Sequence, residues 1–216
     1  MLNNNQKSEE HNYLTNNFLD ILLGMWVYTY PFKNSIDISI DRPKGFIVSE
    51  IVNGIDVRNI IEKSNNNVTI RYNNNRYIYI AKKIGIDSFK LCQILKKILY
   101  CSRCEILGLK DSNAIAYQTV ILYSCKNIER YLKLEIDEIS IEALLWDIND
   151  NISLIHSANK FELLIHIEYS YKDVFHQRLK FIEKYGNLLL NFFGYQRFGS
   201  RRPVSHLIGK QIVKND

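Results

Sequence analysis

Residues 108–118 have the sequence Gly-Leu-Lys-Asp-Ser-Asn-Ala-Ile-Ala-Tyr-Gln. Apolar residues on both sides of Lys110 and Asp111 predict two strands, one over 105–109 and one over 117–124. We therefore expect the Asp111 carboxylate at the end of a strand, outside the core. The ammonium of Lys110 would favour the ionised carboxylate, which nucleophilic or general-base chemistry requires. A solvated turn without a chemical role fits the same stretch.

A second distinctive stretch, residues 191–199, has the sequence Asn-Phe-Phe-Gly-Tyr-Gln-Arg-Phe-Gly. Gly194 and Gly199 would let the backbone approach a ligand closely, and Arg197 could hold a carboxylate or a phosphate through two parallel bonds. An unstacked base could lie on the faces of its phenylalanines: Phe192, Phe193 and Phe198. An aromatic mini-core beside a glycine turn is the alternative interpretation.

The remaining patterns predict an α+β fold with a largely antiparallel sheet and flanking helices. Asp87 and Ser88 are expected to begin a helix, and Gly24 and Gly186 to end two others. The further expected strands cover 36–40, 46–52, 68–72, 76–81, 139–146 and 161–168. The expected helices cover 13–23, 88–99, 173–185 and 203–213.

The charge of the chain permits an anionic partner without requiring one. Lysine and arginine exceed the acidic residues by 5, and five basic residues but one acid follow Tyr195. Such a cluster is typical of a surface that contacts phosphate groups. It is equally typical of a basic tail that is only solvated.

The chain has neither the N-terminal pattern of a signal peptide nor a stretch that could span a bilayer, since the apolar run 18–32 is short and contains Asp20. We therefore expect a cytoplasmic protein in which the four cysteines are reduced thiols. Cys101 and Cys104 have metal-ligand spacing, but no second pair completes a zinc site.

Together, the two stretches resemble the signature segments of the TruD family of tRNA pseudouridine synthases, G-x-K-D-x-x-A-x-x-x-Q and N-[YF]-F-G-x-Q-R-F-G. Both match in the family's order, and weaker similarity extends from about Leu23 to the end of the chain. One of the weaker matches is Asn159-Lys160-Phe161, at the place of the family's G-N-x-F segment. Family proteins are roughly twice as long as this chain.

The resemblance implies an incomplete pseudouridine synthase sheet with flanking helices. Residues 1–22 would be a polar lead-in with the start of the first helix, and residues 23–216 the N-terminal portion of the catalytic domain. The insertion domain and the C-terminal half would be absent, and a second polypeptide could supply that half. The alternatives are a non-catalytic RNA-binding module and an inactive fragment.

The implied reaction isomerises uridine 13 of tRNA to pseudouridine, without a cofactor or a metal. Asp111 falls on the catalytic aspartate, as a nucleophile or as a base. The implied substrate-binding residues are Lys110, Gln118, Asn191, Phe193, Gln196, Arg197 and Phe198. Ile40 stands where the family has a basic residue near the active site, so Arg42 or Lys44 is a candidate replacement.

Overall fold

The computed structural model describes residues 13–32, 35–63, 75–148, 153–190, 192, 194–195 and 204–214. The chain divides into two compact units. Ile38–His166 form the sheet unit, and Met1–Asp37 with Ile167–Asp216 form the helical unit. The domain limits expected from the sequence stay a prediction.

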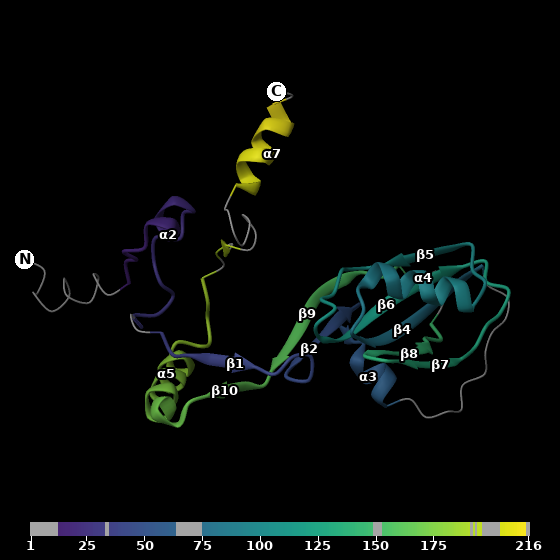
Figure 1. Cartoon of the computed structure of the whole chain (residues 1–216), viewed down its shortest axis with the longest axis horizontal. Helices are drawn as coiled ribbons and strands as arrows, with labels where there is room; N and C mark the ends of the chain where they lie inside the picture. Colours follow the sequence, from purple (N-terminus) through teal and green to yellow (C-terminus); the bar gives the residue numbers. More distant parts are fainter. Residues whose placement is uncertain are drawn as a thin grey trace, which may run out of the picture. The chain divides into compact units, whose positions relative to one another are not determined.

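The sheet unit is built on a mixed sheet in which most neighbouring strands are antiparallel (Figure 1). The parallel neighbours are β2 and β6. Along the sheet the strands are β3 (Ile55–Asp56), β2 (Phe46–Val52), β6 (Ile115–Tyr123), β4 (Arg76–Ile84), β8 (Ile139–Leu145) and β7 (Tyr131–Ile136). In addition, β5 (Arg103–Ile106) pairs with β6, and β9 (His156–Leu163) with β2. The predicted α+β fold with a largely antiparallel sheet is confirmed.

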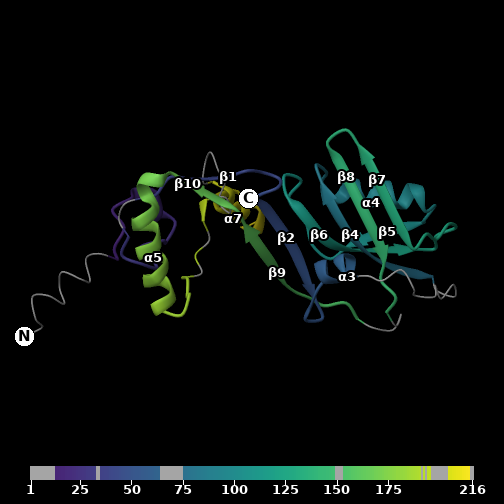
Figure 2. The same ribbon diagram turned by 90° about the horizontal axis from the view of Figure 1, so that it is seen from below.

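A separate two-stranded sheet joins β1 (Ile38–Ile40) to β10 (Ile165–Ile167). Each lies close in sequence to one member of the pair formed by β2 and β9. Those two strands run side by side over their whole length (Figure 2).

The two central strands, β4 and β6, are buried because both of their faces are covered. On one face, Leu91 and Leu95 of α4 (Ser88–Ile98) and Leu99 just after it pack with Tyr79 and Ala81 of β4. The opposite face carries Ile80 and the short helix α3 (Arg58–Glu62). Because side chains alternate along a strand, Lys83 faces α4 and Lys82 faces the other way.

Helix α4 begins where the sequence predicts. The side chain of Asp87 accepts a hydrogen bond from the backbone N–H of Lys90 and so caps the first turn. This end of α4 lies beside residues 110–118, because the hydroxyl of Ser88 bonds to Gln118 and accepts from the backbone of Lys110. The start of the helix is thereby fixed to the first distinctive stretch.

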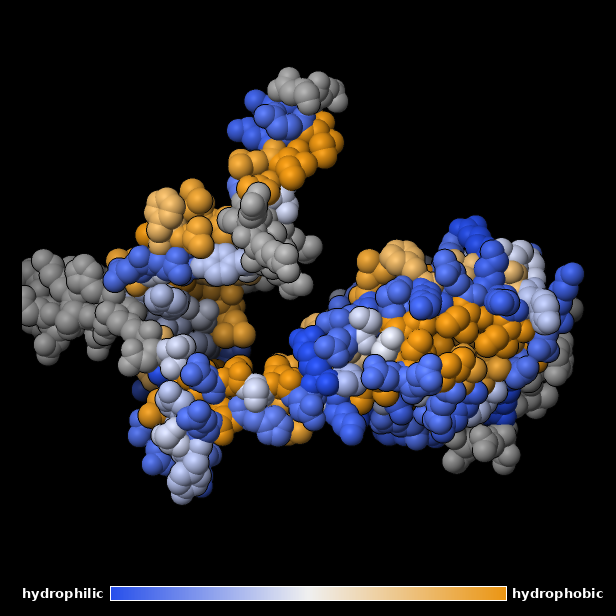
Figure 3. Space-filling model, viewed as in Figure 1, coloured by the Kyte–Doolittle hydropathy of each residue, from blue (hydrophilic) through white to orange (hydrophobic). Residues whose placement is uncertain are grey.

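The helical unit contains α2 (Phe18–Leu22), the turn η1 (Tyr169–Tyr171), α5 (Lys172–Lys184) and α7 (Ser205–Lys214). None of the described residues of these helices is buried. The apolar residues of α7 gather along one side (Figure 3). Ile212 and Val213 on this helix are 70% and 84% exposed.

The predicted elements differ from the observed ones in several places, among them the strand expected over 161–168, where the structure has the end of β9 and the separate strand β10, and the helix α3, which was not expected. Strand β7 was not expected, although Tyr131–Ile136 alternates apolar and polar residues and pairs with β8 as a hairpin. The first helix covers five residues instead of the expected 13–23, because Asn17 caps it only at Phe18. The strand expected over 68–72 lies outside the described residues.

The expectation of reduced cysteines is wrong for this structure. Cys92 is bonded to Cys104, and Cys101 to Cys125. The packing of α4 against β5, which sequence spacing does not reveal, brings Cys92 beside Cys104. Within the described residues there is no cluster of three or more potential metal ligands, and no helix is long and apolar enough to cross a membrane.

Candidate active site

Asp111 lies in the loop between β5 and β6, and its side chain is 46% exposed. One carboxylate oxygen, Oδ1, accepts a hydrogen bond of 3.0 Å from the backbone N–H of Asn113. The other, Oδ2, lies 2.9 Å from Nη1 of Arg42. The carboxylate is therefore held in one orientation at the surface of the sheet unit.

Arg42 comes from the turn between β1 and β2, just before a cis peptide bond to Pro43. Its guanidinium lies 4.2 Å from the centre of the Phe46 ring and so stacks on the first residue of β2. Of the two candidates to replace the basic residue missing at Ile40, the structure brings Arg42 to Asp111.

Lys110 does not pair with Asp111, contrary to the sequence-based expectation. Its Nζ lies 2.8 Å from Oε1 of Glu50, and both side chains are buried. The second Glu50 oxygen accepts a bond of 2.7 Å from the backbone N–H of Thr119. The reason is a competition between partners: a buried ammonium needs a buried carboxylate, and Asp111 is at the surface.

Gly108 leaves the space in which this ion pair forms. A Cβ atom at Gly108 would lie 3.0 Å from Nζ of Lys110 and 3.5 Å from Oε1 of Glu50. A larger residue would therefore crowd the pair. Since removing one partner of a buried ion pair costs about 3–5 kcal/mol, the pair strongly constrains where residues 108–110 can run.

Gln118 and Lys110 lie beneath the Asp111 loop and not on its surface. The Ser88 hydroxyl accepts a bond of 2.9 Å from the Lys110 N–H and donates one of 2.8 Å to Oε1 of Gln118. Gln118 is fully buried, and Lys110 is 8% exposed. In these positions Gln118 and Lys110 can support the Asp111 loop from below. The family resemblance had implied that they contact the substrate.

Lys83 is a further buried cation beneath Asp111. Its Nζ donates to the backbone carbonyls of Ile86, Lys110 and Asp111 at 2.7, 3.3 and 2.9 Å. Burial lowers the pKa of Lys83 from its usual 10.5 to about 8, although the charges of Asp111 and Asp87 act in the opposite direction.

Phe161 is a site residue that the sequence analysis did not single out. Its ring is parallel to that of Phe46, with the two centres 6.1 Å apart, and it is 57% exposed. The two rings meet because β9 pairs with β2, opposing Phe161 to Val48. The sequence signal that could have identified Phe161 is the match of residues 159–161 to a family segment.

The second distinctive stretch cannot be placed beside Asp111. Its expected substrate-binding residues lie outside the described part of the chain: Asn191, Phe193, Gln196, Arg197 and Phe198. Residues 188–190, which precede it, line a cavity of about 660 Å³ within the helical unit. Aromatic side chains contribute most of its other wall, including Tyr28, Tyr30, Phe181 and Tyr185.

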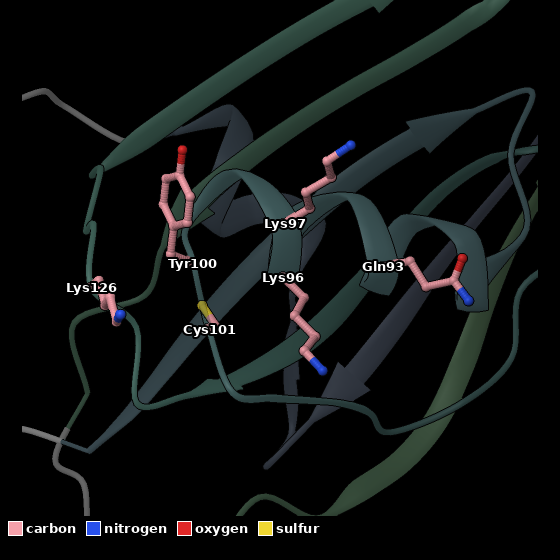
Figure 4. Close-up of a pocket in the computed structure, with 6 residues that line it drawn as sticks. All are labelled: Gln93, Lys96, Lys97, Tyr100, Cys101 and Lys126. Carbon is pink, nitrogen blue, oxygen red and sulfur yellow. The ribbon is translucent and has the colours of Figure 1, made fainter.

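A shallow hollow of about 460 Å³ lies at the end of α4, apart from the Asp111 network (Figure 4). Its lining residues are Gln93, Lys96, Lys97, Tyr100, Cys101 and Lys126. Lys96 and Lys97 leave the helix in different directions, and the Tyr100 ring is 67% exposed. None of the three lysines forms an ion pair with another described residue.

Comparison with known proteins shows which family the chain resembles over most of its length. Residues 23–216 match the family model for tRNA pseudouridine synthase D (TruD). A probable tRNA pseudouridine synthase D of Saccharolobus solfataricus is 32% identical over 203 residues, which cover 94% of this chain and 50% of that protein. A relative of the same description from Sulfurisphaera tokodaii is 36% identical over 137 residues, covering 63% of this chain and 35% of the relative.

A solved structure shares the fold. It is that of a putative tRNA pseudouridine synthase D from Methanosarcina mazei, with a TM-score of 0.58 and 24% identity. The match covers 90% of this chain and 42% of that one. The chain thus spans about half the length of the first relatives that it matches.

Proposed function

Because this chain belongs to the TruD family of tRNA pseudouridine synthases, we propose that it forms the N-terminal part of an enzyme that isomerises uridine 13 of tRNA to pseudouridine. The remaining part of the enzyme would be the C-terminal half present in the longer relatives, as a continuation of the chain or as a second polypeptide. The sheet unit and the helical unit would both belong to one catalytic domain.

The observation that carries the proposal is the Asp111 carboxylate. It is exposed, it is oriented by Arg42 and Asn113, and a buried polar network anchors its loop. A fixed carboxylate beside a guanidinium can act as a nucleophile or remove a proton, and both routes fit this geometry.

The reaction needs little more than positioning and proton transfer. The bond between N1 of uracil and C1′ of ribose breaks, the base turns, and a bond forms between C1′ and C5. The proton lost from C5 is balanced by one gained at N1. Asp111 would attack the sugar or the base as a nucleophile, or remove a proton from the sugar and return it when the C1′–C5 bond forms. The reacting base would have to leave the RNA stack beforehand.

Exposed aromatic residues near Asp111 would offset the stacking that the base loses. Phe161 is more than half exposed, and Arg42 links its neighbour Phe46 to the carboxylate. We expect Asn191, Phe193 and the other residues of the second stretch to complete this slot. Arg197 would hold Asp111 or a neighbouring phosphate.

A non-catalytic RNA-binding module is the second candidate. It is favoured by the lysines around the α4 hollow and by the exposed ring of Tyr100, since an unpaired basic surface with an aromatic ring suits the backbone and bases of RNA. This candidate requires no intact site at Asp111.

The test compares the natural chain with Asp111→Asn, each supplied with the C-terminal half and unmodified tRNA. We expect pseudouridine from the natural chain and none from the variant, while the tRNA affinity changes by no more than about twofold, because the substitution keeps the shape and removes only the reactive group. Mass spectrometry of the tRNA and filter binding measure the two quantities.

The possible results separate the two candidates. Pseudouridine formation by Asp111→Asn would remove Asp111 from the mechanism. If the natural chain forms no pseudouridine but binds tRNA with a strong salt dependence, the RNA-binding module replaces the enzyme.

A further inference from the structure

Lys83 is a fully buried lysine for which no described carboxylate lies within ion-pairing distance. It stands near the end of β4, on the face that α4 covers. Its Nζ donates three hydrogen bonds to backbone carbonyls, those of Ile86, Lys110 and Asp111. A lysine with these three bonds holds the backbone of the surrounding loops in place and does not pair with another described side chain.

The three carbonyls belong to two different loops. Ile86 is in the turn from β4 to α4, and Lys110 and Asp111 are in the loop before β6. A second tether joins the same loops, since the N–H of Gly85 donates to the carbonyl of Ser112 at 3.1 Å. The backbone carbonyls of residues 110, 111 and 112 thus all accept hydrogen bonds from donors on β4 or on the turn that follows it.

The turn runs close to the backbone of Glu138, between β7 and β8. Gly85 has a φ of +71°, and a Cβ atom there would lie 2.4 Å from the backbone oxygen of Glu138. Only glycine fits this position without a shift of the backbone. The loop that carries Asp111 is therefore anchored to a turn that lies close against the hairpin of β7 and β8.

An ammonium suits these three acceptors better than any other group of its size. It carries three donors and no acceptor, and its charge strengthens each bond. An apolar side chain would leave three buried carbonyls without this partner, and the planar fork of arginine directs its donors differently.

Among the charged groups around the Asp111 loop, Lys83 is a cation that has no ion pair with a described residue. Lys110 is neutralised by Glu50 and Arg42 is paired with Asp111, while Asp87 at the start of α4 caps the helix. The charges of Asp111 and Asp87 favour the ammonium, and that of Lys110 opposes it. Asp87 thus offsets the charge of Lys83 in sum, but the Lys83 ammonium is held by the backbone carbonyl of Asp111 and not by an ion pair of its own with any described residue.

We propose that Lys83 is a positioning residue for the reaction: its ammonium fixes the main chain of Lys110 and Asp111, and thereby directs the Asp111 carboxylate toward Arg42 and the substrate. The part of this inference that concerns the reaction rests on the proposed function. The part that concerns the loop can be tested without it.

The first experiment compares Lys83→Met with Lys82→Met in the full 216-residue chain. Lys82 is the matched control, because it is the neighbouring residue on β4 but faces away from α4 and lies 3.6 Å from Glu142. We expect amide hydrogen exchange at Asp111, Ser112 and Asn113 to become at least about tenfold faster in Lys83→Met and to stay unchanged in Lys82→Met. Equal exchange in both variants would overturn the proposal.

The second experiment adds the C-terminal half and measures turnover of tRNA. Lys83→Met should lower kcat by about a hundredfold with little change in KM, because a small displacement of a reacting group is costly whereas RNA contacts elsewhere persist. An unchanged kcat would overturn the positioning role. If the natural chain is also inactive, the proposed function fails, and hydrogen exchange alone decides whether Lys83 holds the loop.

A titration of the natural chain covers the case in which Lys83→Met does not fold. The NMR signals of the Lys83 side chain and of the Asp111–Asn113 amides are followed from pH 6.5 to pH 9.5. If Lys83 holds the loop, the amide signals shift with the same midpoint as Lys83, near pH 8. Amide signals that do not follow Lys83 would contradict the proposal.

Discussion

Arg42 and Asp111, 69 residues apart in the chain, form an ion pair of 2.9 Å at the surface of the sheet unit. The two side chains are 37% and 46% exposed, so the pair contributes only about 0–1 kcal/mol to stability. The orientation that the pair gives the carboxylate matters more than the free energy it provides, because the same guanidinium is also fixed on the ring of Phe46.

Replacing Arg42 should therefore affect turnover far more than stability. With the C-terminal half present, Arg42→Met should lower kcat about tenfold or more, because the carboxylate loses one of its two orienting bonds. The melting temperature should change by no more than that of Lys133→Met, which breaks an exposed pair with Glu135 at 2.9 Å. Initial rates and thermal melts measure the two effects.

The control Lys133→Met should keep full activity, since Lys133 lies on β7 and belongs to no part of the site. Equal rates for Arg42→Met and the natural chain would show that Asn113 alone orients Asp111.

Local patterns in the sequence were sufficient to predict the main elements. The alternation and apolar runs predict β2, β6 and β8, and Asp87 predicts the start of α4, because these signals arise within a few residues of the element. The partner of Lys110 could not be predicted in this way. Glu50 is 60 residues distant, and only the packing of β2 beside β6 brings it to the loop.

The exposed ring of Phe161 should bind RNA without supporting the fold. We expect Phe161→Ala to weaken tRNA binding by about 1–3 kcal/mol, the contribution of one stacked base, and to change the unfolding free energy little because the ring is 57% exposed. Phe89→Ala is the matched control, since that ring on α4 is 62% exposed but lies on a different element. Filter binding at one fixed salt concentration compares the two variants.

Equal losses of affinity in both phenylalanine variants would indicate a non-specific effect and would remove Phe161 from the site. Their immediate neighbours do not distinguish the two residues, since each is a phenylalanine beside a lysine, and the only sequence signal for Phe161 is the match of residues 159–161 to a family segment. The register of β9 against β2 distinguishes them, because it stacks Phe161 on Phe46 and hence near Arg42.

The buried ammonium of Lys83 should leave a signature in the pH dependence of stability. Its pKa is about 8 in the folded chain and near the usual 10.5 when unfolded. Between these values the unfolded chain binds more protons than the folded chain, so the contribution of Lys83 to stability rises with pH and is least favourable below pH 8. Above pH 10.5 the contribution no longer changes.

The natural chain should accordingly gain stability relative to Lys83→Met as the pH rises from 7 to 9.5. Denaturant unfolding at intervals across this range measures the difference, in which effects common to both proteins cancel, such as the burial-raised pKa values of Tyr79 and Tyr117. Lys82→Met, measured in parallel, shows what removing a lysine from the other face of the same strand does to the measurement. A difference between the natural chain and Lys83→Met that is flat or falls with pH would mean that the ammonium of Lys83 is not desolvated beneath Asp111.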